Sequence, residues 1–231
     1  MRAAGGGTLY GVKTGASRRR SARAAARLRR LLVPERALWE RGFYRVAGLD
    51  EAGVGPLAGP VVAAAVVFAP GSGLRGVDDS KKLAPARRAA LAGEIRAAAV
   101  AWAVVAVDPP EIDAVNIYRA GLLAMVRALE ALDPAPDYLL VDGRATLDSR
   151  IPQEKVIGGD AKCHAIAAAS ILAKTERDRL MVDYDGRYPG YGFADHKGYP
   201  TAAHREAIRR LGPSPIHRRS FTLLPHPRLF D

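Results

Sequence analysis

Hydrophobic and polar positions along this chain follow two periods, a period of two that is typical of strands and a longer one that is typical of helices. Five segments have strand character, at residues 44–49, 61–68, 99–107, 138–141 and 155–157. The second of them is apolar at nearly every position, which is typical of a strand buried on both faces of a sheet. We therefore predict five strands.

Helical periodicity fills the intervals between most of these strands. Helices are predicted at residues 31–41, 85–98, 111–132, 161–182 and 202–211. Pro85 stands where a helix begins, whereas Pro134 and Pro136 follow the third helix and end it. The middle of the fourth helix is small and apolar on every side, which suits a helix packed closely against a sheet.

The order of the elements predicts the fold. The first strands are joined by links short enough for antiparallel pairing, whereas strands four and five follow a helical crossover, which implies parallel pairing beside strand one. We predict an α/β domain with a mixed five-stranded sheet flanked by helices. After Tyr188 the chain becomes rich in Pro, Gly, Tyr and His, and we expect a small C-terminal extension of helix and loops.

Length and composition narrow the class of protein. The chain of 231 residues fits one domain, residues 31–231, with a sizeable core. No uncharged apolar run reaches the roughly 18 residues that a membrane span needs. The single cysteine, Cys163, excludes an internal disulfide and fits a reducing compartment. We expect a cytoplasmic monomer without a membrane span.

The net charge of +11 is concentrated in an N-terminal segment. Residues 1–30 hold nine of the 35 Lys and Arg residues and no Asp or Glu, which leaves 26 basic and 24 acidic side chains in the rest of the chain. Because this segment is rich in Ala, Gly and Ser, it lacks the apolar surface that would order it, and we expect a disordered basic arm. Phosphate binding, a transit peptide and an extension without function are all compatible with this composition.

Carboxylates follow two of the predicted strands. Asp50 and Glu51 come directly after the first strand, and Asp142 follows the fourth. If these strands are parallel neighbours, their carboxylates emerge at the same edge of the sheet, where Asp160 also precedes a helix. Four close carboxylates repel one another unless a cation neutralises them, and oxygen ligands without Cys or His favour Mg²⁺ or Mn²⁺.

Each of these side chains also has a simpler interpretation. Asp160 alone fits a helix N-cap, and Asp142-Gly143 alone is a common turn sequence. Their joint placement favours a metal site, and metal-assisted hydrolysis of a phosphodiester is the chemistry that such a site suits. The glycines of the loop at residues 53–55 would let its backbone approach a ligand closely.

The passage at residues 49–60 resembles the opening motif of the type 2 ribonuclease H family, ribonuclease HII. Further segments that match the family's motifs follow in order, namely Asp79-Ser80-Lys81-Lys82-Leu83, Glu111-Ile112-Asp113, Val141-Asp142-Gly143, Gly159-Asp160, Arg177-Asp178, His196-Lys197-Gly198-Tyr199 and Ile216-His217-Arg218. The resemblance implies a ribonuclease H-like fold. It also implies an endonuclease that cuts the RNA strand of RNA–DNA hybrids and ribonucleotides embedded in duplex DNA, leaving 5′-phosphate and 3′-hydroxyl ends. The four carboxylates would be its catalytic metal ligands.

Further residues gain candidate roles in substrate binding from the resemblance. Tyr199 matches the aromatic residue that packs on the sugar at the RNA-to-DNA junction, although a tyrosine in a Gly-Tyr-Pro sequence is also typical of a turn or a core. Ser80, Lys81 and Lys82 stand at a helix start, which makes them a candidate phosphate site or a solvated turn. The C-terminal segment, about residues 184–231, would then contact the substrate.

The chain departs from the family at two positions. The family's loop is Gly-Arg-Gly, whereas this chain has Gly53-Val54-Gly55. We expect the backbone contacts of this loop to the 2′-hydroxyl to persist, while a cation near a phosphate is lost. Where the family has Asn after Asp-Gly, this chain has Arg144, which brings a guanidinium to the same edge and makes it a candidate substitute.

Other functions fit parts of the sequence. Residues 53–58 satisfy the G-x-G-x-x-A pattern of dinucleotide-binding folds, but they lead into a strand instead of a helix. A non-catalytic nucleic-acid-binding protein would not need an intact set of four acids. A ribonuclease H of the sister type lacks the Gly-Arg-Gly loop and needs a longer RNA tract, and Val54 leaves that alternative open.

Overall fold

The computed structural model describes residues 15–224, apart from the side chains of residues 15–18 and 20. Within this part of the chain, five strands form one sheet with the order β3-β2-β1-β4-β5. The strands are β1 (Val46–Ala52), β2 (Val61–Val67), β3 (Ala101–Val107), β4 (Tyr138–Asp142) and β5 (Gln153–Val156). The pairs β1–β2 and β2–β3 are antiparallel, whereas β4 lies parallel to both β1 and β5. The predicted mixed sheet is confirmed.

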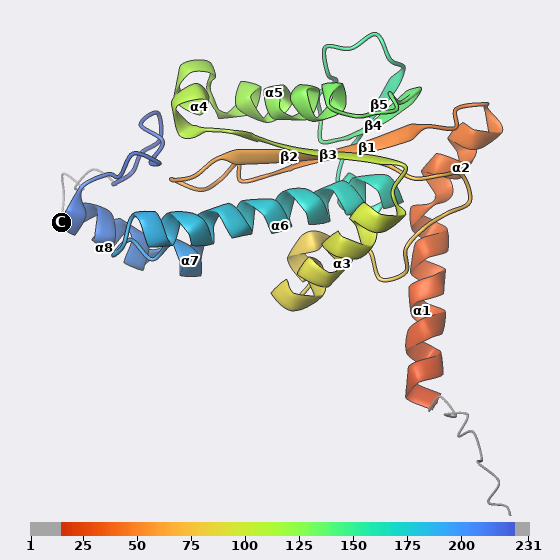
Figure 1. Cartoon of the computed structure of the whole chain (residues 1–231), viewed down its shortest axis with the longest axis horizontal. Helices are drawn as coiled ribbons and strands as arrows, with labels where there is room; N and C mark the ends of the chain where they lie inside the picture. Colours follow the sequence, from red (N-terminus) through yellow and green to blue (C-terminus); the bar gives the residue numbers. More distant parts are fainter. Residues whose placement is uncertain (1–14, 225–231) are drawn as a thin grey trace, which may run out of the picture.

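Helices cover both faces of this sheet. They are α1 (Gly15–Leu31), α2 (Val33–Glu40), α3 (Pro85–Ala98), α4 (Pro109–Val115), α5 (Ile117–Glu130), α6 (His164–Arg187), α7 (Phe193–His196) and α8 (Ala202–Leu211), with single 3₁₀ turns η1 (Ser80–Lys82) and η2 (Gly159–Ala161). In Figure 1, α4 and α5 lie on one side of the sheet and α3 and α6 on the other. No helix in the described residues is long and apolar enough to cross a membrane.

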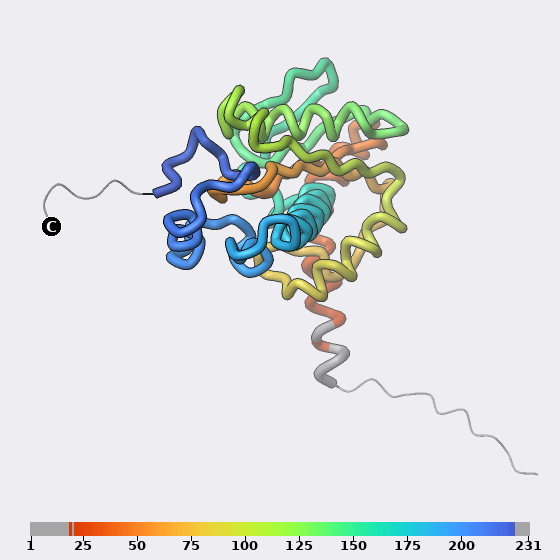
Figure 2. Tube along the Cα trace, turned by 60° about the vertical axis from the view of Figure 1, so that its left-hand side comes forward, coloured from red at the N-terminus to blue at the C-terminus, as the bar shows by residue number. Residues whose placement is uncertain are grey.

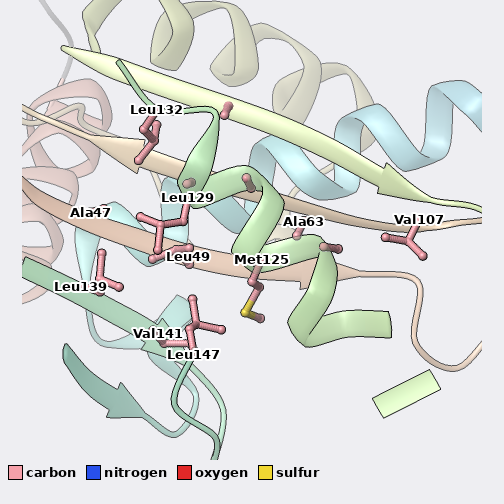
Figure 3. Packing of buried hydrophobic residues seen from close by; sticks show 14 of the residues in the cluster. Ala47, Leu49, Ala63, Val107, Met125, Leu129, Leu132, Leu139, Val141 and Leu147 are labelled. Atoms are coloured by element: carbon pink, nitrogen blue, oxygen red, sulfur yellow. The ribbon is translucent and has the colours of Figure 1, made fainter. Parts of the chain in front are cut away.

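The core consists of two apolar layers, one on each face of the sheet. On one face, Leu49 and Ala63 pack with Met125 and Leu129 of α5 (Figure 3). On the other face, the alternate residues of β2 pack against α3 and α6. Every residue of β2 is buried, as its apolar sequence predicts for a strand covered on both faces.

The start of α6 lies directly on β1. A Cβ atom at Gly48 would be 2.2 Å from the backbone carbon of Ala165 and from the backbone nitrogen of Ile166. Only glycine permits this approach without moving the backbone. The contact holds the N-terminal end of α6, and the turn before it, beside the strand that carries Asp50.

Several element bounds differ from the predicted ones. Strand β1 continues to Ala52, so Asp50 and Glu51 lie within the strand, paired with residues of β2. The single helix predicted at residues 111–132 is two helices, because Asn116 takes a positive φ of 73° and its side chain caps α5 by accepting from the Arg119 backbone N–H. Asparagine tolerates this conformation and favours N-caps, so it interrupts a pattern that is otherwise continuous.

The prediction of a disordered arm over residues 1–30 is wrong for residues 15–30, which belong to α1, while residues 1–14 lie outside the described part of the chain. Arg27 makes two polar contacts that join this helix to the body. Arg27 pairs with Asp78 at 2.5 Å and donates to the Ala161 carbonyl oxygen at 2.9 Å. Alanine and arginine also have high helix propensity. The turns of α1 before Arg27 that Figure 2 draws in colour project from the domain.

Candidate active site

The strands bring the predicted carboxylates together. In the parallel pairing of β1 with β4, Leu49 lies opposite Val141, so Asp50 and Asp142 follow at the same edge of the sheet. Asp142 Oδ1 accepts a hydrogen bond from the Gly159 backbone N–H at 2.7 Å, which holds η2 and its Asp160 at this edge. All four carboxylates line one cleft of about 430 Å³.

Glycine makes this turn possible. A Cβ atom at Gly159 would be 2.5 Å from Ile166 Cδ1 and 3.2 Å from Asp142 Oδ1, and the preceding Gly158 has a φ of 65°. Side chains larger than hydrogen would therefore displace η2 from the strand end. The Gly-Gly-Asp sequence thus determines where Asp160 lies.

For Asp50, Glu51 and Asp160, the cleft disfavours the negatively charged form of the carboxyl group. Burial raises the pKa of Asp50 well above its usual value, and the negative charges of Glu51 and Asp142 raise it further. Burial, with a contribution from Asp142, raises the pKa of Glu51 to about 7. Burial and the negative charges of Asp79 and Asp142 also raise the pKa of Asp160, which Lys81 opposes. A cation bound in the cleft would relieve this repulsion.

The donor chemistry of the cleft fits a hard divalent cation. Within the described residues, none of the four carboxylates forms a salt bridge with Lys, Arg or His. As these side chains stand, no three His, Cys, Asp or Glu residues in the described part of the chain are close enough to enclose a metal ion. The carboxylates nevertheless share the cleft without cationic partners, and carboxylate oxygens are the ligands that Mg²⁺ and Mn²⁺ prefer.

Basic side chains also border the cleft. Lys81 and Lys174 both line it. Asp79 orients the first of these by accepting from the Lys81 backbone N–H at 2.9 Å, and it pairs with Lys82 Nζ at 3.3 Å. Of the three predicted phosphate-site residues, Ser80 and Lys81 line the cleft and Lys82 does not. Ser80 is buried and shares a hydrogen bond of 3.0 Å with Ser170, so it joins η1 to α6.

The loop at residues 53–55 lines the cleft, and hydrogen bonds from a buried arginine fix its backbone. Arg218 is fully buried, and its guanidinium donates to four carbonyl oxygens at 2.5–3.0 Å, those of Gly53, Val54, Pro56 and Gly59. Burial lowers the pKa of Arg218 to about 9, which leaves it charged at neutral pH. The loop backbone is therefore held in one conformation before any ligand arrives.

A second buried arginine joins this loop to the turn that carries Tyr199. Arg177, also fully buried, donates to the carbonyl oxygens of Ala58 and Pro60 and to that of Lys197. A Cβ atom at Gly53 would lie 2.1 Å from Arg177 Nε, so the loop and the guanidinium are in direct contact. Both arginines lie in segments that match the motifs named above, but nothing in the local sequence pattern indicates that their side chains are buried.

Tyr199 lies in the cleft and not in the core. Its side chain is 40% exposed, which excludes the alternative of a core aromatic, and it lines the cleft beside the loop. Lys174 Nζ lies 5.7 Å and Arg177 Cζ 5.8 Å from the centre of its ring. The ring thus presents a flat surface next to both basic side chains and carboxylates.

The two departures from the family's motifs face a second hollow of about 120 Å³ beside the cleft. Val54, 40% exposed, and Arg144 line this hollow together with Glu51 and Asp142. Apolar side chains such as Ile117 complete it. Arg144 therefore lies at the same end of the sheet as the catalytic candidates, as its position after Asp142 predicts.

The family model described as ribonuclease HII matches residues 47–224. A ribonuclease HII from Anaeromyxobacter sp. (strain Fw109-5) is 57% identical over 195 residues. The chain belongs to the ribonuclease HII family. That alignment covers 84% of this chain and 62% of the relative, so the chain spans less than two thirds of the relative's length.

Other ribonuclease HII relatives match over nearly their whole length. The ribonuclease HII of Moorella thermoacetica is 53% identical over 88% of this chain and 98% of its own. Among solved structures, the ribonuclease H2 of Pyrococcus horikoshii OT3 has a TM-score of 0.68 at 30% identity, over 78% of this chain and 94% of that one. The ribonuclease H-like fold implied by the motifs is thereby confirmed for this chain.

Proposed function

We propose that this member of the ribonuclease HII family is an endoribonuclease. It hydrolyses the RNA strand of RNA–DNA hybrids and cuts at ribonucleotides embedded in duplex DNA, leaving 5′-phosphate and 3′-hydroxyl ends. The observation that carries the proposal is that four carboxylates, which form no salt bridge within the described residues, line the same cleft as the loop at residues 53–55 and Tyr199.

The four carboxylates are proposed to hold Mg²⁺ or Mn²⁺. When bound, such ions lower the pKa of an attacking water and stabilise the departing 3′-oxygen. The protein supplies the fixed positions, since Asp50 and Asp142 are set by neighbouring strands and Asp160 by the Gly159 hydrogen bond. The basic side chains of Lys81 and Lys174 are placed to attract the phosphodiester into the cleft.

Recognition of the ribonucleotide is proposed to use the loop and the tyrosine. The 2′-hydroxyl is the group by which a protein distinguishes RNA from DNA at one position. Backbone groups of Gly53 and Gly55 would bind this hydroxyl, and Tyr199 would pack on the adjoining sugar. Val54 supplies no charge to the neighbouring phosphate, and Arg144 is proposed to replace it in part. We further propose a cytoplasmic monomer, which light scattering and cell fractionation would test.

The decisive experiment compares two substrates in Mg²⁺ and in Mn²⁺. One is a DNA duplex with a single ribonucleotide, and the other is a uniform RNA–DNA hybrid. Cleavage of both supports the proposal, whereas cleavage of the hybrid alone would assign the sister-type activity.

Substitution of the carboxylates tests the chemistry directly. Asp50→Asn and Asp142→Asn should each abolish cleavage of both substrates, because each removes a negative ligand, while the melting temperature should not fall, since repulsion in the cleft decreases. Near wild-type turnover in either variant would contradict the metal site and favour a different catalytic centre.

A further inference from the structure

A hydrogen bond from a histidine holds the backbone of Tyr199. Its carbonyl oxygen accepts hydrogen bonds from the Thr201 backbone N–H at 2.8 Å and from His204 Nδ1 at 2.9 Å. A carbonyl oxygen only accepts, so His204 Nδ1 must carry the hydrogen. In a neutral ring, Nε2 of the same histidine is then an acceptor.

A second histidine supplies the hydrogen that this acceptor needs. The Ser214 backbone N–H points at His217 Nδ1 at 2.8 Å, which makes that nitrogen an acceptor and places the ring hydrogen on Nε2. His217 Nε2 lies 3.1 Å from His204 Nε2 and therefore donates to it. Both rings are almost completely buried, so water does not compete for these bonds.

The two histidines connect three segments that meet at the loop of the cleft. His217 lies in a bridge with Ala58, and the backbone N–H of Arg218 donates to the Leu57 carbonyl oxygen. The Leu57 backbone N–H in turn donates to the Gly198 carbonyl oxygen at 2.8 Å, next to Tyr199. Hydrogen bonds therefore connect the loop to the C-terminal segment, the C-terminal segment to α8 through the two histidines, and α8 to the turn at residues 197–199, which is itself bonded to the loop.

We propose that His204 and His217 form a relay of two opposite neutral tautomers, which positions Tyr199 for recognition of the ribonucleotide. The inference rests on the proposed function, in which Tyr199 contacts the substrate sugar. Neither histidine touches the cleft, so both are positioning residues. The direction of the relay follows from its two ends, because a carbonyl oxygen terminates it at one end and a backbone N–H begins it at the other.

Simple packing is the competing explanation. His204 and His217 lie among aromatic rings, with the ring centre of Phe193 5.5 Å and 5.6 Å away respectively. If packing alone mattered, any ring of similar volume would serve. If the relay matters, the position of each ring hydrogen decides the outcome.

Nitrogen NMR of the full chain tests the tautomers without any activity measurement. Long-range ¹⁵N–¹H correlation spectra, assigned by single histidine substitutions, should show His204 protonated at Nδ1 and His217 at Nε2. The Tyr199 carbonyl oxygen keeps the hydrogen on His204 Nδ1 in either variant, so the readout is the ¹⁵N shift of His204 Nε2. His217→Gln, whose amide nitrogen can replace Nε2 as donor, should preserve the shift of a hydrogen-bonded acceptor, whereas His217→Phe should move it toward that of an unbonded ring nitrogen. Two histidines in the same tautomer in the wild-type protein would overturn the relay.

Kinetics with matched variants test the positioning. His204→Phe keeps an aromatic ring, slightly larger than imidazole, and loses both hydrogen bonds. It should raise KM for the single-ribonucleotide duplex about tenfold with kcat changed less than about threefold. His204→Asn retains a donor at the Nδ1 position and should stay within about threefold of wild type in KM. As a control in the same cluster, Tyr191→Phe removes a hydrogen bond to the Gly212 carbonyl oxygen and should leave this KM unchanged.

The outcomes separate this inference from the proposed function. Equal KM values for His204→Phe and wild type, or equal impairment in the Asn and Phe variants, would refute positioning by the relay even if the enzyme cuts both substrates. Absence of cleavage in the wild-type protein would instead refute the proposed function. The tautomer spectra would still decide whether the relay exists.

Discussion

Arginine serves two different purposes in the N-terminal helix and in the C-terminal half of this molecule. In α1, Arg23, Arg29 and Arg30 are exposed, and Arg27 makes polar contacts that join the helix to the body. In the C-terminal half, Arg177 and Arg218 are fully buried and donate to the carbonyl oxygens of the loop and turns around the cleft.

The difference shows what a count of charges does and does not reveal. The arginine-rich segment dominates the net charge, yet most of its described guanidinium groups lie on the surface, where single charges contribute little to stability. The buried pair adds only two charges, but each organises backbone from distant parts of the chain. Removing a buried donor leaves several carbonyl oxygens unpaired, which costs far more than removing a surface charge.

The sharpest test of this contrast substitutes one arginine from each class. Arg218→Met should lower the free energy of unfolding by roughly 3–5 kcal/mol, because it leaves four carbonyl oxygens, all but that of Val54 buried, without their donor. Arg30→Met in α1 should change it by less than about 0.5 kcal/mol. Urea denaturation of both variants provides the measurement. Equal effects would mean that the buried arginine does not brace the loop.

The complementary test adds an exposed arginine to the loop at residues 53–55, which Arg218 holds in place. Val54→Arg should add a charge-assisted phosphate contact of about 1–3 kcal/mol, or about tenfold to a hundredfold in kcat/KM. The gain should be larger on the single-ribonucleotide duplex than on a long hybrid, where other contacts share the positioning. Arg144→Asn in the wild-type background should reduce activity. If Val54→Arg changed neither substrate's kcat/KM, the loop would not position the junction phosphate.

A buried acid in the N-terminal region extends the comparison to negative charge. Glu35 in α2 accepts from the Ala165 backbone N–H at the start of α6, and burial raises its pKa to about 7. A raised folded-state pKa contributes stability that is present below the unfolded value of 4.5 and lost as pH rises through about 7. Glu35→Gln should therefore be more stable than wild type at pH 8, by about 1–3 kcal/mol.

The pH dependence of that difference is the control. Thermal unfolding at pH 8 and at pH 5 should show the advantage of Glu35→Gln shrinking toward zero at the lower pH. A constant difference across this interval would indicate that Glu35 does not change its protonation there.

The smallest expected effect concerns the exposed face of α1. Replacing Arg19, Arg23 and Arg30 with Gln should reduce the slope of log K against log salt for duplex binding by about 2–3 units if all three contact phosphates. The chemical step and the folding stability should not change. Titrations at several salt concentrations give the slope, and replacing the exposed Arg36, Arg41 and Arg45 with Gln controls for the loss of three charges alone. An unchanged slope would mean that α1 does not touch the substrate.

Local sequence patterns predicted those parts of the structure that depend on neighbouring residues. The bounds of α3 and α8 agree with the prediction, and β2 is buried throughout as its apolar sequence requires. The carboxylate edge was predictable as well, since it follows from strand order and from residues at strand ends. These features need only periodicity, caps and the geometry of parallel strands.

The remaining features depend on contacts that are distant in sequence. Arg27 orders α1 through Asp78 and Ala161, which lie 51 and 134 residues further along. The donors of Arg218 meet acceptors up to 165 residues earlier. No local pattern distinguishes these arginines from the exposed ones, so their roles emerge only when the chain is folded.

The separation in sequence between Arg218 and Gly53 also sets the order in which the cleft is completed during synthesis. A growing chain contains all four carboxylates once residue 160 has been added, but the brace of the loop arrives with residue 218. Until then the carbonyl oxygens at residues 53 and 54 lack their donor, and the turn that carries Tyr199 has not been joined to the C-terminal bridge. The nascent polypeptide thus carries its four acids while a further 58 residues (218 − 160) are added, and only then can the loop beside them take its fixed conformation.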